Sequence, residues 1–175
     1  KGLNHQDPMP DVKSFEDLPS EHQLRKKIID KLPDEYKESF NKEWPVEVRP
    51  INPVDLMNPE PKEPQNFIWF KARSSLPNDV SLHQCVLAYM SDMTLLDTCT
   101  NPHGVNFMNP NLHSASLDHA MWFHRPFKAD EWLLYHQDSP SASGARGFNR
   151  GSIFDLDGNL IASVAQEGLI RFTKN

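Results

Sequence analysis

The sequence predicts an α+β domain in which an antiparallel β-sheet curves around one long apolar helix. Two observations predict this fold class. One apolar segment of helix length occupies residues 81–96, and strand-like segments lie before and after it, the last two joined by the hairpin signal Asp157-Gly158. The chain has 175 residues, which corresponds to about one domain with a sizeable core.

The chain divides by composition into two parts. Residues 1–64 contain 10 of the 15 prolines and 24 of the 42 charged residues. Prolines exclude long regular elements there, apart from a short helix predicted at Ser20–Leu32, which Ser20 caps and Pro33 ends. We therefore predict a proline-rich linker or arm over residues 1–44 and a folded domain over residues 45–175.

The folded part is predicted to contain six strand-like segments around one helix. The segments are Pro45–Asn52, Gln65–Ser74, His113–His124, Trp132–Gln137, Arg146–Asp155 and Leu160–Phe172. The helix covers Ser81–Leu96, and its predicted buried stripe consists of Leu82, Cys85, Val86, Tyr89, Met93 and Leu96. Because other helix positions are apolar as well, we expect the helix to be buried on most sides.

Composition and charge exclude several function classes. The net charge of −6 argues against non-specific binding to nucleic acid or to an anionic membrane surface. No apolar segment approaches the ~20 residues that span a bilayer, and no signal-peptide pattern is present. Two cysteines, Cys85 and Cys99, form no disulfide framework, which indicates an intracellular setting. The eight histidines show no metal-ligand spacing, so no metal site is predicted.

Two polar residues occupy positions where the pattern favours apolar ones. Asp92 lies at the edge of the predicted buried stripe, where a paired carboxylate is suited to act as a general base; the alternative is a helix-edge side chain that reaches solvent. Gln166 has the same parity as Ala162 and Val164, so its amide is expected to point into the core. The alternative for Gln166 is a structural hydrogen bond to a neighbouring backbone group.

The segment His113–His124 contains Ser116, Asp118 and His119, which suggests a local catalytic triad. In a continuous strand, however, His119 points to the opposite face from Ser116 and Asp118. Strand geometry therefore argues against the triad, and His119 is interpreted as a structural histidine.

Four segments together resemble the acyl-CoA thioesterase II family, which includes the bacterial TesB type and peroxisomal acyl-CoA thioesterases. They are LAYMSDMTLL at 87–96, SLDHAMWFHRPF at 116–127, WLLYHQDSPSASGARGFNRG at 132–151 and DGNLIASVAQEGLIR at 157–171. The resemblance covers residues 44–172 and implies the hotdog fold, an antiparallel sheet around a long central helix. Family members contain two hotdog units, and this chain resembles the second unit with the linker that precedes it.

The resemblance implies three site residues by motif. Asp92 of YMSD would activate the attacking water, while Ser116 before LDH and Gln166 of QEG would orient it. Many relatives have Thr where this chain has Ser116, which keeps the hydroxyl and loses the methyl that restricts its rotamer. The implied activity is hydrolysis of fatty acyl-CoA to free fatty acid and CoA, with no metal and no cofactor.

The resemblance also implies a partner and a compartment. The chain would form a homo-oligomer or pair with an N-terminal hotdog that it lacks. The alternative function is a non-catalytic hotdog half that dimerises or binds acyl-CoA; a hotdog enoyl-CoA hydratase is disfavoured, because no matching Asp–His pair precedes the helix. Within the cell, the peroxisome is favoured and the cytoplasm is the alternative, since the C-terminal sequence FTKN is not an SKL-type signal.

Overall fold

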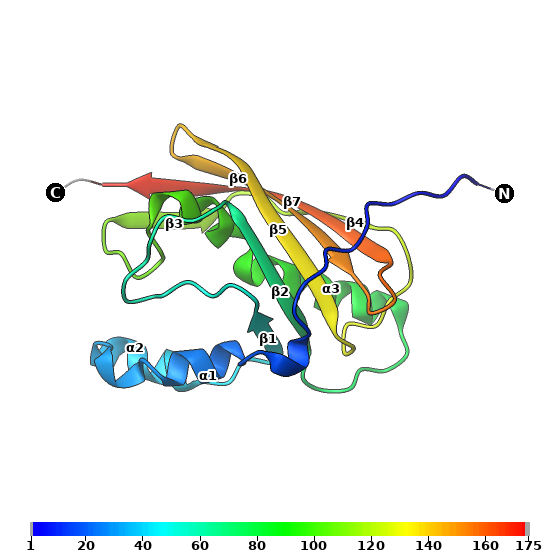
Figure 1. Ribbon diagram of the computed structural model, residues 1–175, viewed down its shortest axis with the longest axis horizontal. Coiled ribbons are helices and arrows are strands. Elements are labelled where there is room, and N and C mark those ends of the chain that lie inside the picture. The colour runs from blue at the N-terminus through cyan, green and yellow to red at the C-terminus, as the bar shows by residue number, and fades with distance from the viewer. Residues whose placement is uncertain (1, 174–175) are drawn as a thin grey trace.

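One antiparallel sheet organises the computed structural model, which describes residues 2–173. Its strands are β1 (Val46–Pro50), β2 (Gln65–Ala72), β3 (Leu112–Ser116), β4 (Ala120–Phe123), β5 (Leu133–Ser143), β6 (Arg146–Phe154) and β7 (Leu160–Phe172). The strand order is β1-β2-β5-β6-β7-β3. Strand β4 pairs with the first part of β7, and β3 pairs with the last part (Figure 1). The predicted strand His113–His124 is therefore two strands that share β7 as their partner.

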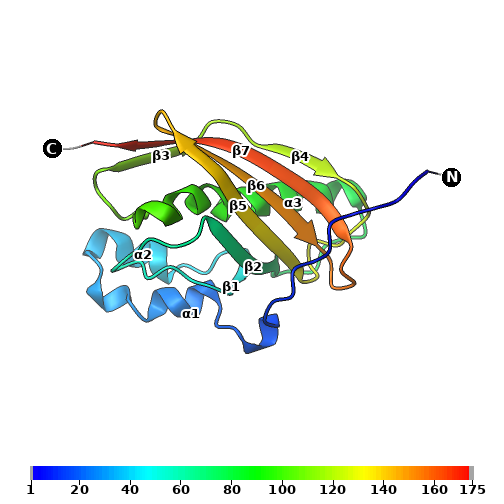
Figure 2. The same ribbon diagram turned by 45° about the horizontal axis from the view of Figure 1, so that its top comes forward.

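Helix α3 (Val80–Leu95) lies across one face of the sheet, which we call the inner face (Figure 2). It begins where the Asp79 side chain accepts hydrogen bonds from the amides of Ser81 and Leu82. The 3₁₀ helix η3 (Leu96–His103) continues it and ends at Gly104, whose φ of 59° lies in the left-handed region. The predicted α+β architecture, a sheet around one long helix, is confirmed.

The buried side of α3 differs from the predicted stripe. The buried residues are His83, Leu87, Met90, Ser91 and Leu95. Cys85 and Tyr89, which the prediction placed in the core, are exposed. Because α3 is apolar on nearly every side, periodicity could not identify the side that meets the sheet. One apolar side of α3 therefore faces solvent in this chain.

The N-terminal arm covers the other, outer face of the sheet, as Figure 1 shows for the segment that crosses in front of β5. A second hydrophobic cluster forms there between the strand residues Trp69, Leu134 and Phe154 and the arm residues Met9, Val12, Phe15 and Leu18. Phe15 packs edge-on against Trp69 and stacks on Trp132, with ring centroids 5.4 and 4.6 Å apart. The arm is thus packed against the sheet by aromatic contacts.

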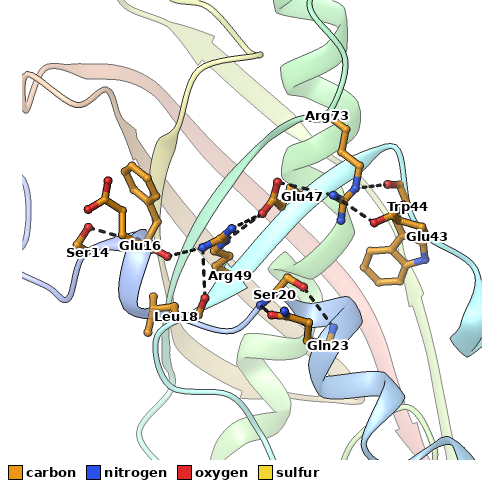
Figure 3. Close-up of polar contacts among 11 residues, drawn as sticks. Ser14, Glu16, Leu18, Ser20, Gln23, Glu43, Trp44, Glu47, Arg49 and Arg73 are labelled. Atoms are coloured by element: carbon orange, nitrogen blue, oxygen red, sulfur yellow. Dashed lines mark hydrogen bonds and ion pairs between the residues drawn. The ribbon is translucent and has the colours of Figure 1, made fainter.

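Arginine side chains fasten the arm to β1 (Figure 3). Arg49 donates to the carbonyl oxygen of Phe15 at 2.8 Å and pairs with Glu47 at 2.7 Å. Arg73, directly after β2, pairs with Glu43 at 3.3 Å, so both ends of the helical part of the arm are tied to the sheet region. The bond from Arg49 gives a partner to the carbonyl oxygen of Phe15, which packing of the arm shields from water.

The arm contains more helix than predicted. The expected helix Ser20–Leu32 is divided into α1 (Glu21–Lys26) and the 3₁₀ turn η2 (Ile29–Lys31), and η1 (Phe15–Asp17) precedes them. Ser20 caps α1 as predicted, in a capping box with Gln23. A further helix, α2 (Asp34–Asn41), was not predicted. It lies directly after Pro33, in a stretch without prolines, where the argument from proline content does not apply.

Candidate active site

The three predicted site residues come together from three elements. Asp92 lies on α3, Ser116 ends β3 and Gln166 lies in the middle of β7. Gln166 Nε2 donates to Asp92 Oδ1 at 2.6 Å, and Ser116 Oγ donates to the same oxygen at 3.3 Å. Hydrogen bonds from neutral donors to a carboxylate are stronger than those between neutral groups. One carboxylate oxygen therefore joins the helix to both strands.

Burial differs sharply within this trio. Gln166 is fully buried, which confirms that it points to the core side of β7. The Asp92 side chain is 51% exposed, which agrees with the alternative of a helix-edge side chain that reaches solvent. Asp92 lies on the solvent-exposed side of α3, which we call the open side. Its carboxylate accepts a hydrogen bond from the buried side-chain amide of Gln166. Within residues 2–173, its second oxygen Oδ2 accepts no hydrogen bond, which leaves that oxygen free to accept a proton.

His119 belongs to the same cluster, although the strand argument placed it elsewhere. Its Nδ1 lies 3.7 Å from Asp92 Oδ1, and its Nε2 lies 2.8 Å from Ser91 Oγ. Nδ1 is buried and has no hydrogen-bond partner among the described residues. The site thus contains an imidazole nitrogen that faces the carboxylate at a distance slightly too long for a direct hydrogen bond.

A bulge between β3 and β4 explains why sequence parity failed for His119. Ser116 is opposite Gly168, and Ala120 is opposite Ala165. Between these two pairs the segment that joins β3 to β4 contains one residue more than the facing part of β7. An extra residue reverses the alternation of side chains beyond it. Ser116 and His119 therefore both reach Asp92, whereas Asp118 turns to accept a hydrogen bond from the Glu167 amide at 2.7 Å.

Tyr135 supports the helix turn that carries the site. Its hydroxyl donates to the carbonyl oxygen of Ser91 at 3.2 Å. Burial raises the pKa of Tyr135 well above its usual value, and the charge of Asp92 adds to the effect, so the phenol stays neutral. Gly151 on β6 makes room for this ring, because a Cβ there would lie 2.2 Å from a Tyr135 ring carbon.

Two cavities in the described part of the chain lie away from the site. A largely apolar cavity of about 380 Å³ lies beside the ends of β3 and β7, and a polar one of about 700 Å³ lies between the arm and β4. Neither is lined by Asp92, Ser116 or Gln166. Over residues 2–173 we find no cluster of three His, Cys, Asp or Glu side chains suited to a metal ion, and no helix long and apolar enough to cross a membrane.

Comparison with known proteins gives a consistent result. The sequence matches the family model described as acyl-CoA thioesterase over residues 35–169. It is 39% identical to acyl-CoA thioesterase 2 of Haemophilus influenzae over 99% of this chain and 61% of that protein. The crystal structure of an acyl-CoA thioesterase II, TesB2, from Mycobacterium marinum is similar with a TM-score of 0.74 and 42% identity, over 99% of this chain and 59% of that one.

A more distant structure shows the fold alone. A protein of unknown function with a hot dog fold from Alicyclobacillus acidocaldarius has a TM-score of 0.69 at 16% identity, over 99% of this chain and 59% of that one. The predicted hotdog fold is therefore confirmed. The chain spans 61% of the Haemophilus relative and 59% of the Mycobacterium one, so each relative contains a further part that this chain does not match.

Proposed function

The chain belongs to the acyl-CoA thioesterase family, and on that premise we propose that it hydrolyses fatty acyl-CoA to a free fatty acid and CoA. The observation that carries this proposal is the convergence of Gln166 and Ser116 on Oδ1 of Asp92. A thioester carbonyl is electrophilic enough for an activated water to attack it. A positioned base, with hydrogen-bond donors that fix its orientation, is therefore sufficient for hydrolysis.

Each residue of the trio has a distinct part in the proposed reaction. Asp92 Oδ2 takes a proton from a water while the water oxygen bonds to the thioester carbon. Gln166 and Ser116 hold Oδ1, so the carboxylate cannot rotate away from the water. The tetrahedral intermediate then collapses with cleavage of the C–S bond, and the CoA thiolate recovers the proton that Asp92 holds. The half-exposed position of Asp92 allows substrate to approach from the open side of α3.

The direct test is release of CoA from palmitoyl-CoA, measured with a thiol reagent on the purified chain and on a version extended to the length of its relatives. We expect thiol release from at least the extended protein. Binding of palmitoyl-CoA by the extended protein without release of thiol would contradict hydrolysis. That outcome would support the non-catalytic binding module.

We further propose that the open side of α3 is a pairing surface. Tyr89 is more than half exposed there, and Cys85, one helical turn before it, is exposed as well. Exposed apolar side chains that lie together mark interaction sites. The partner is a second copy of this chain or the further part found in its relatives. Sedimentation of the 20.1 kDa chain at micromolar concentration tests the first option, and a clean monomer would contradict it.

The compartment is a proposal from relatives alone. A Saccharomyces cerevisiae relative, 30% identical over 71% of this chain, is named a peroxisomal acyl-coenzyme A thioester hydrolase. The Haemophilus influenzae relative is bacterial, so family membership does not fix the compartment. We propose the peroxisome, with the cytoplasm as the alternative, and imaging of the tagged natural protein in its source cell would decide between them.

A further inference from the structure

Three buried amide side chains lie on the inner face, one on each of three adjacent strands. Gln137 is on β5, Asn149 on β6 and Gln166 on β7, and all three are fully buried. They lie beneath the C-terminal part of α3 and η3, because Gln137 contacts Thr94 and Thr98 and Gln166 contacts Asp92. A buried amide needs partners for its donor and its acceptor.

Gln137 has both partners. Its Nε2 donates to Thr94 Oγ1 at 2.6 Å, and its Oε1 accepts from Thr98 at 3.2 Å. No group of the catalytic trio takes part in these bonds. Gln137 is therefore a structural amide that ties β5 to the helix.

Asn149 and Gln166 differ, because they have complementary atoms without partners. In the β6–β7 ladder, Asn149 is directly opposite Gln166, and both point to the inner face. Directly opposite residues have Cβ atoms ~4.5–5.5 Å apart, within reach of one amide for another. Among the described residues, Gln166 Oε1 and both polar atoms of Asn149 have no hydrogen-bond partner. A free acceptor thus lies beside a free donor.

Among the described residues, the other neighbours of Asn149 offer at most the sulfur of Cys99, which is a weak acceptor. Gly147 and Gly151 flank it on the same face of β6 and have no side chains. Above it, Cys99 donates its thiol proton to the carbonyl oxygen of Leu96. Burial raises the pKa of Cys99 to about 11, so the thiol is neutral, although a side-chain hydrogen bond from Asn149 acts in the opposite direction. Gln166 Oε1 is the one strong acceptor opposite Asn149.

We propose that Asn149 is a positioning residue for the thioesterase reaction. Its Nδ2 donates to a buried water that in turn donates to Gln166 Oε1, and this bridge holds the Gln166 amide with Nε2 toward Asp92. Gln166 is then fixed at both ends, by Asp92 on one side and Asn149 on the other. The expected effect of Asn149 on kcat rests on the proposed function. The expected effect on the orientation of the Gln166 side chain rests only on the two facing amides.

The test compares Asn149→Leu with Gln137→Met, which removes an equally buried amide that does not contact the trio. Asn149→Ala serves as a second variant if leucine disturbs folding. We expect the Asn149 variants to lower kcat for palmitoyl-CoA about 10-fold, the value of one hydrogen bond, with little change in KM. Gln137→Met should lower thermal stability and leave kcat unchanged. In the Gln166→Ala background, Asn149→Leu should cost nothing further.

A second readout does not depend on activity. The side-chain amide protons of Gln166 are assigned by NMR from the signals that Gln166→Ala removes, and their exchange with solvent is measured. We expect exchange to become at least about 10-fold faster in Asn149→Leu and to stay unchanged in Gln137→Met. If the parent protein hydrolyses no palmitoyl-CoA, the proposed function fails while the exchange rates still decide the positioning role. Unchanged Gln166 exchange in Asn149→Leu, or independent effects of the two substitutions on kcat, would overturn the proposal.

Discussion

The two ends of the inner face of the sheet carry different kinds of buried side chain. Toward the N-terminal half of α3, the face is apolar and fully packed, with Phe70, Leu87, Leu133, Ile153 and Ile161 almost completely buried. Toward its C-terminal half, the same strands carry Gln137, Asn149 and Gln166. Burial of apolar surface stabilises the first end without orienting anything, whereas each amide of the second end must find a directional partner. The apolar end therefore contributes mainly to stability, while two of the three amides lie at or beside the proposed site.

The largest expected effect is at the amide end. Asp92→Asn keeps the size and polarity of the side chain and removes the base, so kcat for palmitoyl-CoA should fall ~10²–10⁴-fold. The thermal midpoint should change little, because the side chain is half exposed. Asp97→Asn, five residues along the same helical segment, is the matched control and should retain activity. Parent-like activity in Asp92→Asn would remove Asp92 from the mechanism.

The reverse result is expected at the apolar end. Leu87→Ala removes a fully buried side chain from the core and should lower the free energy of unfolding by ~2–5 kcal/mol. The kcat of the remaining folded protein should change little, since Leu87 belongs to the apolar core cluster and not to the trio of Asp92, Ser116 and Gln166. Val80→Ala, at an exposed position of the same helix, is the control and should change stability by less than ~0.5 kcal/mol. Urea denaturation measures both variants.

A smaller effect is expected for the hydroxyl beside Asp92. Ser116→Ala removes the weaker of the two hydrogen bonds to Oδ1, at 3.3 Å, and should lower kcat about 10-fold. Ser116→Thr restores the hydroxyl and adds a methyl that restricts its rotamer, so its kcat should equal or exceed that of the parent. Steady-state kinetics on the two variants separate the hydroxyl from the side-chain volume. A Thr variant as slow as the Ala variant would contradict this role.

The smallest effect on the folded chain is expected at the open side of α3. Tyr89→Ser removes an exposed ring and should change the free energy of unfolding of the monomer by less than ~0.5 kcal/mol. It should still weaken self-association, because large aromatic side chains dominate interface energetics. Sedimentation velocity across a dilution series measures the shift. Tyr36→Ser, at an exposed aromatic residue of the arm, is the control for a general change in surface hydrophobicity.

Sequence reasoning succeeded where a local pattern determines the outcome. The parity of β7 placed Gln166 on the core side, and the apolar segment located α3 within one residue. It failed where the outcome depends on distant pairing. The extra residue between Ser116 and Ala120 is visible only against β7, so the position of His119 could not be derived from its own segment. The buried side of α3 was likewise undetermined, because the helix is apolar on most sides.

The docking of the arm has a consequence for how the protein is made. Gln6 donates to the carbonyl oxygen of Gly158 and accepts from the amide of Leu160, which a ribosome adds 154 residues later. The arm therefore cannot complete its contacts until β7 has emerged, although it is synthesised before β7. Until β7 is made, the arm lacks its Gln6 anchor, and any outer sheet face left uncovered in that interval is a site of aggregation risk.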